Sequence, residues 1–242
     1  DKGANVMFAD LDEARLDAEV GEEARAEGAV RMFSGDLTEK LTISNLLSAT
    51  IDAFDRVDIL VNASRKMAVS DLLSPDADGV EDLWRQNVLT ALRMSQLTAK
   101  RMIQHAQRAE VEPGTMIGSI INLSSTAAQV TRPELLAYSV AAAAVEQMTR
   151  SLALGLAPKG IRVNAVAFAS VMSASLQAAL KDNHDFRDQI AETTPLRRIA
   201  APQELAEVVQ FLGSDASGFI TGQVFTVDGG RSLLDAVPAP AH

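Results

Sequence analysis

Short apolar runs alternate with helical segments along the whole chain, and this alternation limits the possible folds more than any other feature. A strand with one wet face shows a polar residue at every second position, and these runs lack that alternation. The runs that predict strands are residues 5–9, 29–33, 58–61, 119–123, 161–167 and 224–227. Because such strands are buried on both faces, we expect a parallel sheet covered by helices on both sides, the doubly wound α/β class.

The segments between these runs carry apolar residues at helical spacing. They predict helices at residues 11–27, 38–54, 80–108, 135–156 and 202–212. Gly28 follows the first helix and Pro202 opens the last, and both residues favour those positions at helix ends. Because the chain shows no repeat and no low-complexity linker, we expect a single domain over residues 1–242.

The composition of the chain argues against several classes of function. The net charge is −10 and the isoelectric point is about 4.8, which argues against a nucleic-acid-binding surface. No apolar run reaches the roughly 18 residues that span a bilayer, and we find no signal peptide. The chain has no cysteine, which fits a reducing cytoplasm. We therefore expect a cytoplasmic protein with no membrane partner, no nucleic-acid partner and no metal site.

Several polar residues follow predicted strands, at the edge where open α/β sheets bind ligands. Asp10 could hold both hydroxyls of a ribose, or it could simply be an acid that precedes a helix. Asp36 and Leu37 could frame an adenine ring, or Asp36 could cap the next helix. Asn62 follows the third strand. These four residues are our candidates for binding a cofactor.

Tyr138 is the only tyrosine of the chain and heads a run of alanines. Its ring could fill a gap in the core, or it could belong to an active site. Ser125 follows the fourth predicted strand. Asn87 lies within the long helix at residues 80–108, where a polar side chain either bonds its own turn or serves a site.

Five stretches resemble the short-chain dehydrogenase/reductase family. They are SIINLSS at 119–125, AYS at 137–139, IRVNAVA at 161–167, PLRRIAAPQELAEVVQFL at 195–212 and ITGQVFTVDGG at 220–230. The resemblance implies a Rossmann-like sheet and a nicotinamide cofactor. It also implies that Tyr138 is the catalytic tyrosine, which moves a proton while hydride passes between cofactor and substrate. By the same resemblance, Ser125 and Asn87 match the family's catalytic serine and helix asparagine.

Three positions depart from the family pattern. Ala142 stands where the family has a lysine, one helical turn after the tyrosine. The charge of that lysine favours the tyrosinate form, and its ammonium group holds the nicotinamide ribose; alanine does neither. Arg65 puts a bulky cation where the family needs close backbone approach. Phe168 stands where the family has a proline, and it would push a ring towards the nicotinamide.

The family's glycine-rich phosphate-binding turn would lie before Asp1. Its strand would lie between the strands that end at Asp10 and Asn62. Without that strand two sheet edges would be exposed, so either residues that precede Asp1 fill the gap or the flanking strands close up. We therefore expect a Rossmann-like domain that is incomplete at its N-terminus.

These losses meet at one pocket, and they suggest a subunit that has lost cofactor binding. We expect a non-catalytic structural subunit that binds no NAD itself and pairs with an active sister subunit, in which NAD would bind. The helices at 135–156 and 202–212 would form the contacts of such a heterotetramer. The pattern of losses is similar to that in a non-catalytic subunit of a dehydrogenase for a hydroxybenzylsuccinyl-CoA thioester. The alternative is an active NAD-dependent enzyme of the family with further residues before Asp1.

Overall fold

The predicted parallel strands are all present, and they form two separate sheets. The computed structural model describes residues 3–26, 28–183, 185–235 and 237. The strands are β1 (Val6–Asp10), β2 (Val30–Ser34), β3 (Ile59–Asn62), β4 (Gly118–Ser125), β5 (Ile161–Phe168) and β6 (Val224–Val227). One sheet pairs β1 with β2, and the other has the order β3-β4-β5-β6. Every pairing is parallel.

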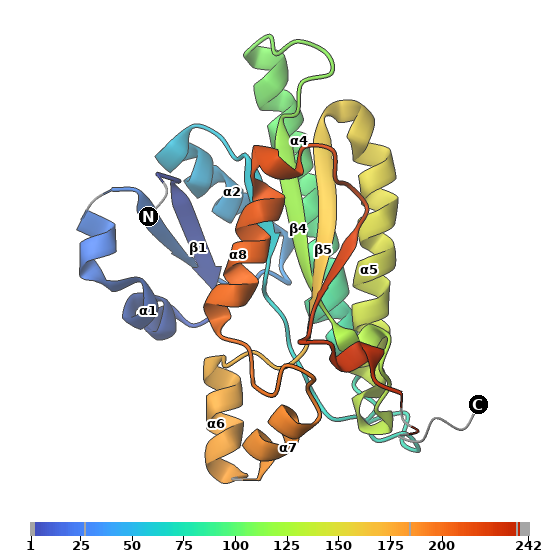
Figure 1. Cartoon of the computed structure of the whole chain (residues 1–242). Coiled ribbons are helices and arrows are strands. Elements are labelled where there is room, and N and C mark those ends of the chain that lie inside the picture. Colours follow the sequence, from blue (N-terminus) through green and yellow to red (C-terminus); the bar gives the residue numbers. More distant parts are fainter. Residues whose placement is uncertain (1–2, 27, 184, 236, 238–242) are drawn as a thin grey trace.

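Helices cover these sheets on both faces (Figure 1). They are α1 (Glu13–Ala26), α2 (Lys40–Phe54), α3 (Val80–Leu83), α4 (Thr90–Arg108), α5 (Leu136–Leu156), α6 (Ala174–Asp182), α7 (Phe186–Glu192) and α8 (Pro202–Gly213). Short 3-10 turns lie at Thr126–Ala128, Pro133–Leu135, Ala157–Lys159, Asp215–Ser217 and Arg231–Leu233. The long helix predicted at 80–108 is interrupted by a π-helical turn, Trp84–Leu89, and the sequence did not predict α6 or α7. In the described part of the chain, no helix is long and apolar enough to cross a membrane.

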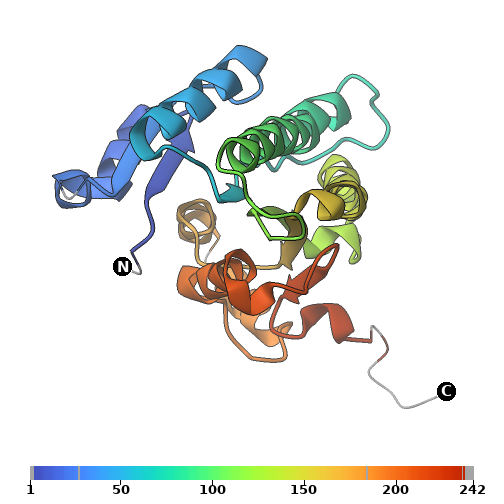
Figure 2. The same ribbon diagram turned by 90° about the horizontal axis from the view of Figure 1, so that it is seen from above.

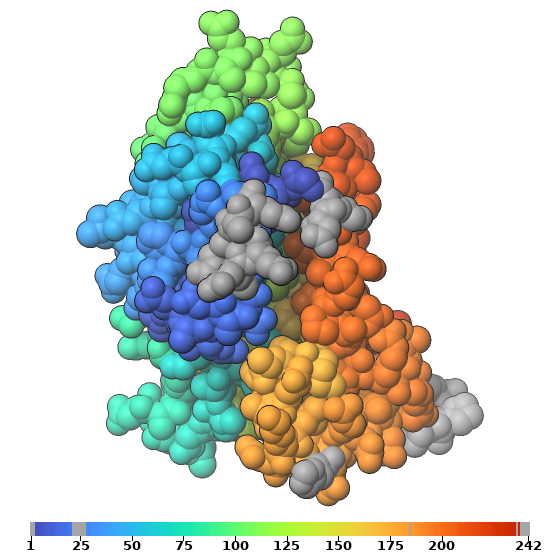
Figure 3. Space-filling view, turned by 90° about the vertical axis from the view of Figure 1, so that its left-hand side faces the viewer, coloured from blue at the N-terminus to red at the C-terminus, as the bar shows by residue number. Residues whose placement is uncertain are grey.

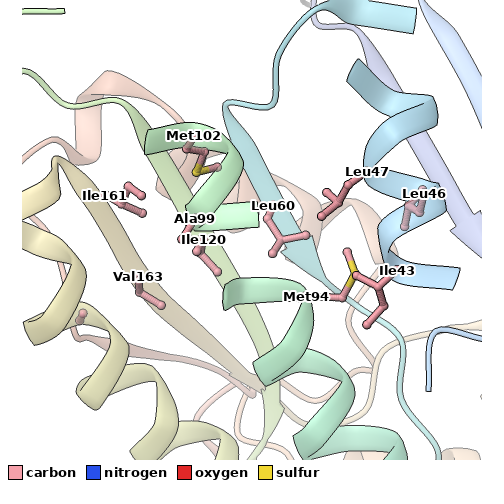
Figure 4. Packing of buried hydrophobic residues seen from close by; sticks show 11 residues of the cluster. Ile43, Leu46, Leu47, Leu60, Met94, Ala99, Met102, Ile120, Ile161 and Val163 are labelled. Carbon is pink, nitrogen blue, oxygen red and sulfur yellow. The ribbon is translucent and has the colours of Figure 1, made fainter. Parts of the chain in front are cut away.

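The core shows why the strands lack alternation. Ile120 and Ile121 are neighbours on β4, point to opposite faces and are both fully buried. Ile120 lies beside Ala99 of α4 (Figure 4) in one core cluster, whereas Ile121 belongs to another cluster that contains Leu212 of α8. All eight residues of β5 are buried as well. Burial on both faces confirms the doubly wound α/β class.

The gap between the two sheets stays open. Viewed from above, β1 and β2 lie with α1 and α2 to one side of the other strands (Figure 2). Neither β1 nor β3 has a second strand partner among the described residues, so the flanking strands do not close up as one expectation allowed. Phe8 of β1 is 46 % exposed, and Ile59 and Val61 of β3 are 46 % and 39 % exposed. The N-terminal part and the C-terminal helices lie side by side on that face of the molecule (Figure 3).

Candidate active site

The carboxyl ends of β3, β4 and β5 form the candidate site. Their last residues are Asn62, Ser125 and Phe168, and the strand register pairs Asn62 with Asn122 and Ser125 with Phe168. Tyr138 lies in the first turn of α5, and its side chain is only 5 % exposed. The parallel register therefore gathers residues from distant parts of the sequence at one edge, as the sequence predicted for Ser125 and Tyr138.

A cation contacts the single tyrosine. The Nη1 group of Arg65 donates a hydrogen bond to the Tyr138 hydroxyl. Its guanidinium carbon lies 5.9 Å from the centre of the Tyr138 ring and 4.4 Å from that of Phe168. A guanidinium group only donates, so the phenol oxygen is the acceptor and its own proton remains available. The sequence singled out Arg65 as an obstacle and did not anticipate this contact.

Asn87 fixes the segment that carries Arg65. Its Oδ1 accepts from the backbone N–H of Lys66 at 2.7 Å, and its Nδ2 donates to the Lys66 carbonyl at 2.8 Å. Asn87 lies on the π-helical turn and is 9 % exposed. Such turns are frequent at functional sites because they reorient side chains within a helix. The Asn87 amide therefore bonds the segment after β3, and its service to a catalytic site stays a prediction.

Asn87, Ser125 and Tyr138 line one small cavity of about 20 Å³, together with Arg65 and Ala142. The Ser125 hydroxyl accepts from the backbone N–H of Ala127 at 3.2 Å. A cavity of this volume holds about one water molecule. The three predicted catalytic residues are therefore brought together, although their catalytic role stays a prediction.

The side-chain amide of Asn62 forms its hydrogen bonds within the protein. Its Nδ2 donates to Oδ1 of Asn122 at 2.7 Å and to the Ser95 hydroxyl at 3.0 Å. Asn122 in turn donates to Thr149 of α5 at 2.8 Å. This buried network ties β3, β4, α4 and α5 together beneath the site. The predicted role of Asn62 in holding a cofactor remains untested, and its visible role is to position these elements.

The other cofactor candidates lie away from Tyr138, on the β1–β2 sheet. Asp10 ends β1 and accepts from the backbone N–H of Asp12 at 3.0 Å. Asp36 accepts from the backbone N–H of Thr38 at 2.8 Å, and this hydrogen bond lowers the pKa of the Asp36 carboxyl. Asp36 does not cap α2, because the cap position is Glu39. Leu37 packs against the core cluster.

The candidate residues at the strand ends could contact only part of a nicotinamide dinucleotide. The carboxylate of Asp10 is exposed at a strand end, and its chemistry suits ribose hydroxyls. Within the described residues, however, no glycine-rich turn offers backbone N–H groups to a pyrophosphate at this edge. At the Tyr138 end, the guanidinium of Arg65 covers the ring of Phe168. The residues present therefore do not fit a complete nicotinamide dinucleotide as they stand. The same part of the chain holds no group of three His, Cys, Asp or Glu that could bind a metal.

Comparison with known proteins decides the family. A family profile described as enoyl-(acyl carrier protein) reductase, of the short-chain alcohol dehydrogenase type, matches residues 1–232. An uncharacterized oxidoreductase of Mycobacterium tuberculosis is 33 % identical over 232 residues, which are 96 % of this chain and 84 % of the relative. The chain belongs to the short-chain dehydrogenase/reductase family. The resemblance seen in the sequence and the Rossmann-like fold are thereby confirmed.

Two solved structures extend the comparison. A gluconate 5-dehydrogenase from Burkholderia cenocepacia, in complex with NADP and tartrate, is 28 % identical with a TM-score of 0.81, covering 96 % of this chain and 87 % of that one. A 7α-hydroxysteroid dehydrogenase, in complex with NADH and 7-oxo glycochenodeoxycholic acid, is 28 % identical with a TM-score of 0.82, covering 94 % and 84 %. The fold of this short-chain dehydrogenase/reductase is therefore shared with enzymes whose structures contain nicotinamide cofactors.

Sequence reasoning missed a buried acid next to the site. Glu146 lies two turns after Tyr138 on α5, and its Oε1 accepts from the Ser124 hydroxyl at 3.4 Å. Burial raises the pKa of Glu146, while Arg150, with which it forms an ion pair at 3.6 Å, acts in the opposite direction. The spacing of eight residues, about two helical turns, was the available signal.

Proposed function

We propose that this chain interconverts an alcohol and a carbonyl compound with a nicotinamide cofactor, and that Tyr138 moves the proton. The observation that carries the proposal is the convergence of Tyr138, Ser125 and Asn87 on one cavity at the carboxyl edge of the sheet. The comparisons support this active form, because the relatives over most of the chain bear the names of oxidoreductases. They give less support to a subunit without activity.

The roles of the residues follow from their contacts. A phenol that keeps its proton available can donate it to a carbonyl oxygen, and the phenolate can take a proton from an alcohol. The Ser125 hydroxyl lines the same cavity and can hydrogen-bond the substrate oxygen. Asn87 positions the segment after β3 through the backbone of Lys66.

Turnover by the purified chain tests this function. The relatives suggest the substrates to try first: gluconate as a polyol acid and a 7α-hydroxysteroid as an apolar alcohol. We expect cofactor reduction by at least one hydroxyl compound with NAD or NADP, followed through the absorbance of the reduced nicotinamide. An absence of turnover with both cofactors over a broad panel of alcohols and ketones would count against the proposal.

A non-catalytic structural subunit is the second candidate, and two observations favour it. Ala142 supplies no cation from α5, and the guanidinium of Arg65 lies across the face of Phe168. In this candidate the chain binds no cofactor, and an active sister subunit binds NAD. Its cytoplasmic location stays a prediction, as does any assembly. The comparisons do not support the narrower identity as a subunit of the hydroxybenzylsuccinyl-CoA dehydrogenase.

The exposure of residues on α5 indicates which of its faces a partner subunit could contact. Ala137, Ala141 and Ala153 are buried within the chain itself, so the alanine-rich face is mostly internal packing. A groove of about 410 Å³ instead lies between α4 and α5. Its lining residues are Gln96, Ala99, Lys100, Ile103, Gln104, Leu152 and Leu156. Leu154, on the same helix, is 82 % exposed. If a partner subunit binds α5, we propose that it does so over this groove.

A further inference from the structure

The exposed guanidinium of Arg65 keeps two of its nitrogen donors free. Its Nη1 group donates to the Tyr138 hydroxyl, whereas its Nε and Nη2 groups form no hydrogen bond within the part of the chain that the structure describes. No carboxylate in that part forms an ion pair with Arg65. The neighbouring Lys66, by contrast, pairs with Asp82 at 2.7 Å. Arg65 therefore presents a positive charge that no acid of the described chain neutralises.

Three contacts hold this guanidinium in place before any ligand arrives. Its central carbon lies over the Phe168 ring, 4.4 Å from the ring centre, and this contact uses none of its N–H donors. The hydrogen bond to Tyr138 fixes one end of the group. Asn87 holds the backbone of the next residue, Lys66. A group that is already fixed loses little conformational entropy when it binds a partner.

Two hydroxyl groups beside Arg65 can donate to a ligand. The guanidinium only donates, so the Tyr138 oxygen is the acceptor and its O–H group donates to no described residue. The Ser125 hydroxyl accepts from Ala127 and likewise donates to no described residue. Both residues line the cavity of about 20 Å³, and none of the described residues that line it is acidic. That volume admits one oxygen-sized group, so the remainder of a ligand would lie at the mouth, over Arg65.

We propose that Arg65 is the anion-binding residue of a site for a small hydroxy acid or oxo acid. The two carboxylate oxygens accept from the free Nε and Nη2 donors, which form the planar fork that pairs with carboxylates. The hydroxyl or carbonyl oxygen of the acid accepts from Tyr138 and Ser125. The inference goes beyond the proposed function, because it concerns binding and holds with or without turnover. Where the proposed function also holds, the acid is its class of substrate, and that statement rests on it.

Lactate, a 2-hydroxy acid, and its neutral analogue lactamide test the site in the purified chain without a cofactor. Ligand-observed NMR titration measures both affinities. We expect lactamide to bind wild type, and lactate to bind Arg65→Gln, about tenfold or more weakly than lactate binds wild type, because a hydrogen bond to a charged group is lost. Arg65→Lys keeps the charge without the planar fork and should lie between. The matched control Arg108→Gln removes an exposed charge at the end of α4 and should bind lactate like wild type.

Equal affinity of wild type for lactate and lactamide would overturn the proposal, and this comparison does not depend on how any variant folds. Equal affinity of wild type and Arg65→Gln for lactate would overturn it as well, with circular dichroism to verify that the variant is folded. Propionate lacks the hydroxyl and should bind more weakly than lactate; equal binding would exclude the predicted contacts with Tyr138 and Ser125.

Failure of this site is distinguishable from failure of the proposed function. Turnover of neutral alcohols without charge-dependent binding of lactate would leave the proposed function standing and remove the site at Arg65. Charge-dependent binding of lactate without any turnover would leave the site standing and remove the function.

Discussion

Replacing Asn87 should both destabilise the fold and release the segment that carries Arg65. Asn87→Ala deletes the two hydrogen bonds to the backbone of Lys66, at 2.7 and 2.8 Å. Each such bond contributes about 0.5–1.5 kcal/mol, so we expect a loss of about 1–3 kcal/mol in the free energy of unfolding. For a chain of this size, each kcal/mol lowers Tm by about 2–4 °C.

Urea unfolding of wild type and variant measures the first effect. Gln86→Ala is the matched control, because Gln86 is the preceding residue on the same π-helical turn and its side chain has no hydrogen bond in the described structure. The second effect is a fall in kcat/KM in Asn87→Ala, because the segment that contacts Tyr138 is then less firmly held. If the free energies of unfolding of Asn87→Ala and Gln86→Ala differ by less than about 0.5 kcal/mol, the two hydrogen bonds to the Lys66 backbone contribute little to stability, and our account of the segment is wrong.

Three further predictions concern stability and assembly. Burial raises the pKa of Glu146 in the folded state above 4.5, so the free energy of unfolding should fall as the pH rises from the pKa of the unfolded state through that of the folded state. Glu146→Gln should make the free energy of unfolding, measured by urea melts, depend less on pH across that range. An unaltered dependence on pH would contradict this. Ile120→Ala should cost about 2–5 kcal/mol in the free energy of unfolding, because its side chain is fully buried in the main core cluster; a loss below about 1 kcal/mol would contradict this, because it would mean that the neighbours fill the cavity. If α5 binds a partner, Leu154→Glu should lower the mass measured by light scattering and leave the circular dichroism unchanged, and an unaltered mass would place the interface elsewhere.

The fold was predictable because the apolar runs and the helix-end signals indicated the same elements. The unbroken apolar run of β5 corresponds to eight consecutive buried residues, and the glycine and proline signals lay close to the helix ends. The π-helical turn was not predictable, because Trp84–Leu89 has the same apolar spacing as the helix around it. The sequence allowed two outcomes at the gap, residues that precede Asp1 or closure of the flanking strands, and the separate β1–β2 sheet shows that the strands do not close up.

The site was only partly predictable. Motif spacing located Ser125 and Tyr138, which lie on consecutive elements. The contact between Arg65 and Tyr138 joins segments far apart in sequence, and only the tertiary fold decides where a flexible side chain of that length points. Asn62 was predicted as a ligand-binding residue, yet its amide donates hydrogen bonds to Asn122 and Ser95. No local sequence pattern indicates these two partners.

The central claim is that Tyr138 moves the proton in a reaction performed by this chain. The most direct test compares kcat/KM of wild type and Tyr138→Phe in the purified chain, on whichever substrate of the panel turns over fastest, with Ser151→Ala as a control that removes one exposed hydroxyl from the same helix. We expect Tyr138→Phe to lose about a hundredfold or more, equivalent to about 2.7 kcal/mol of transition-state stabilisation, while Ser151→Ala is unchanged. Equal activity of Tyr138→Phe and wild type would contradict the account and favour the non-catalytic subunit.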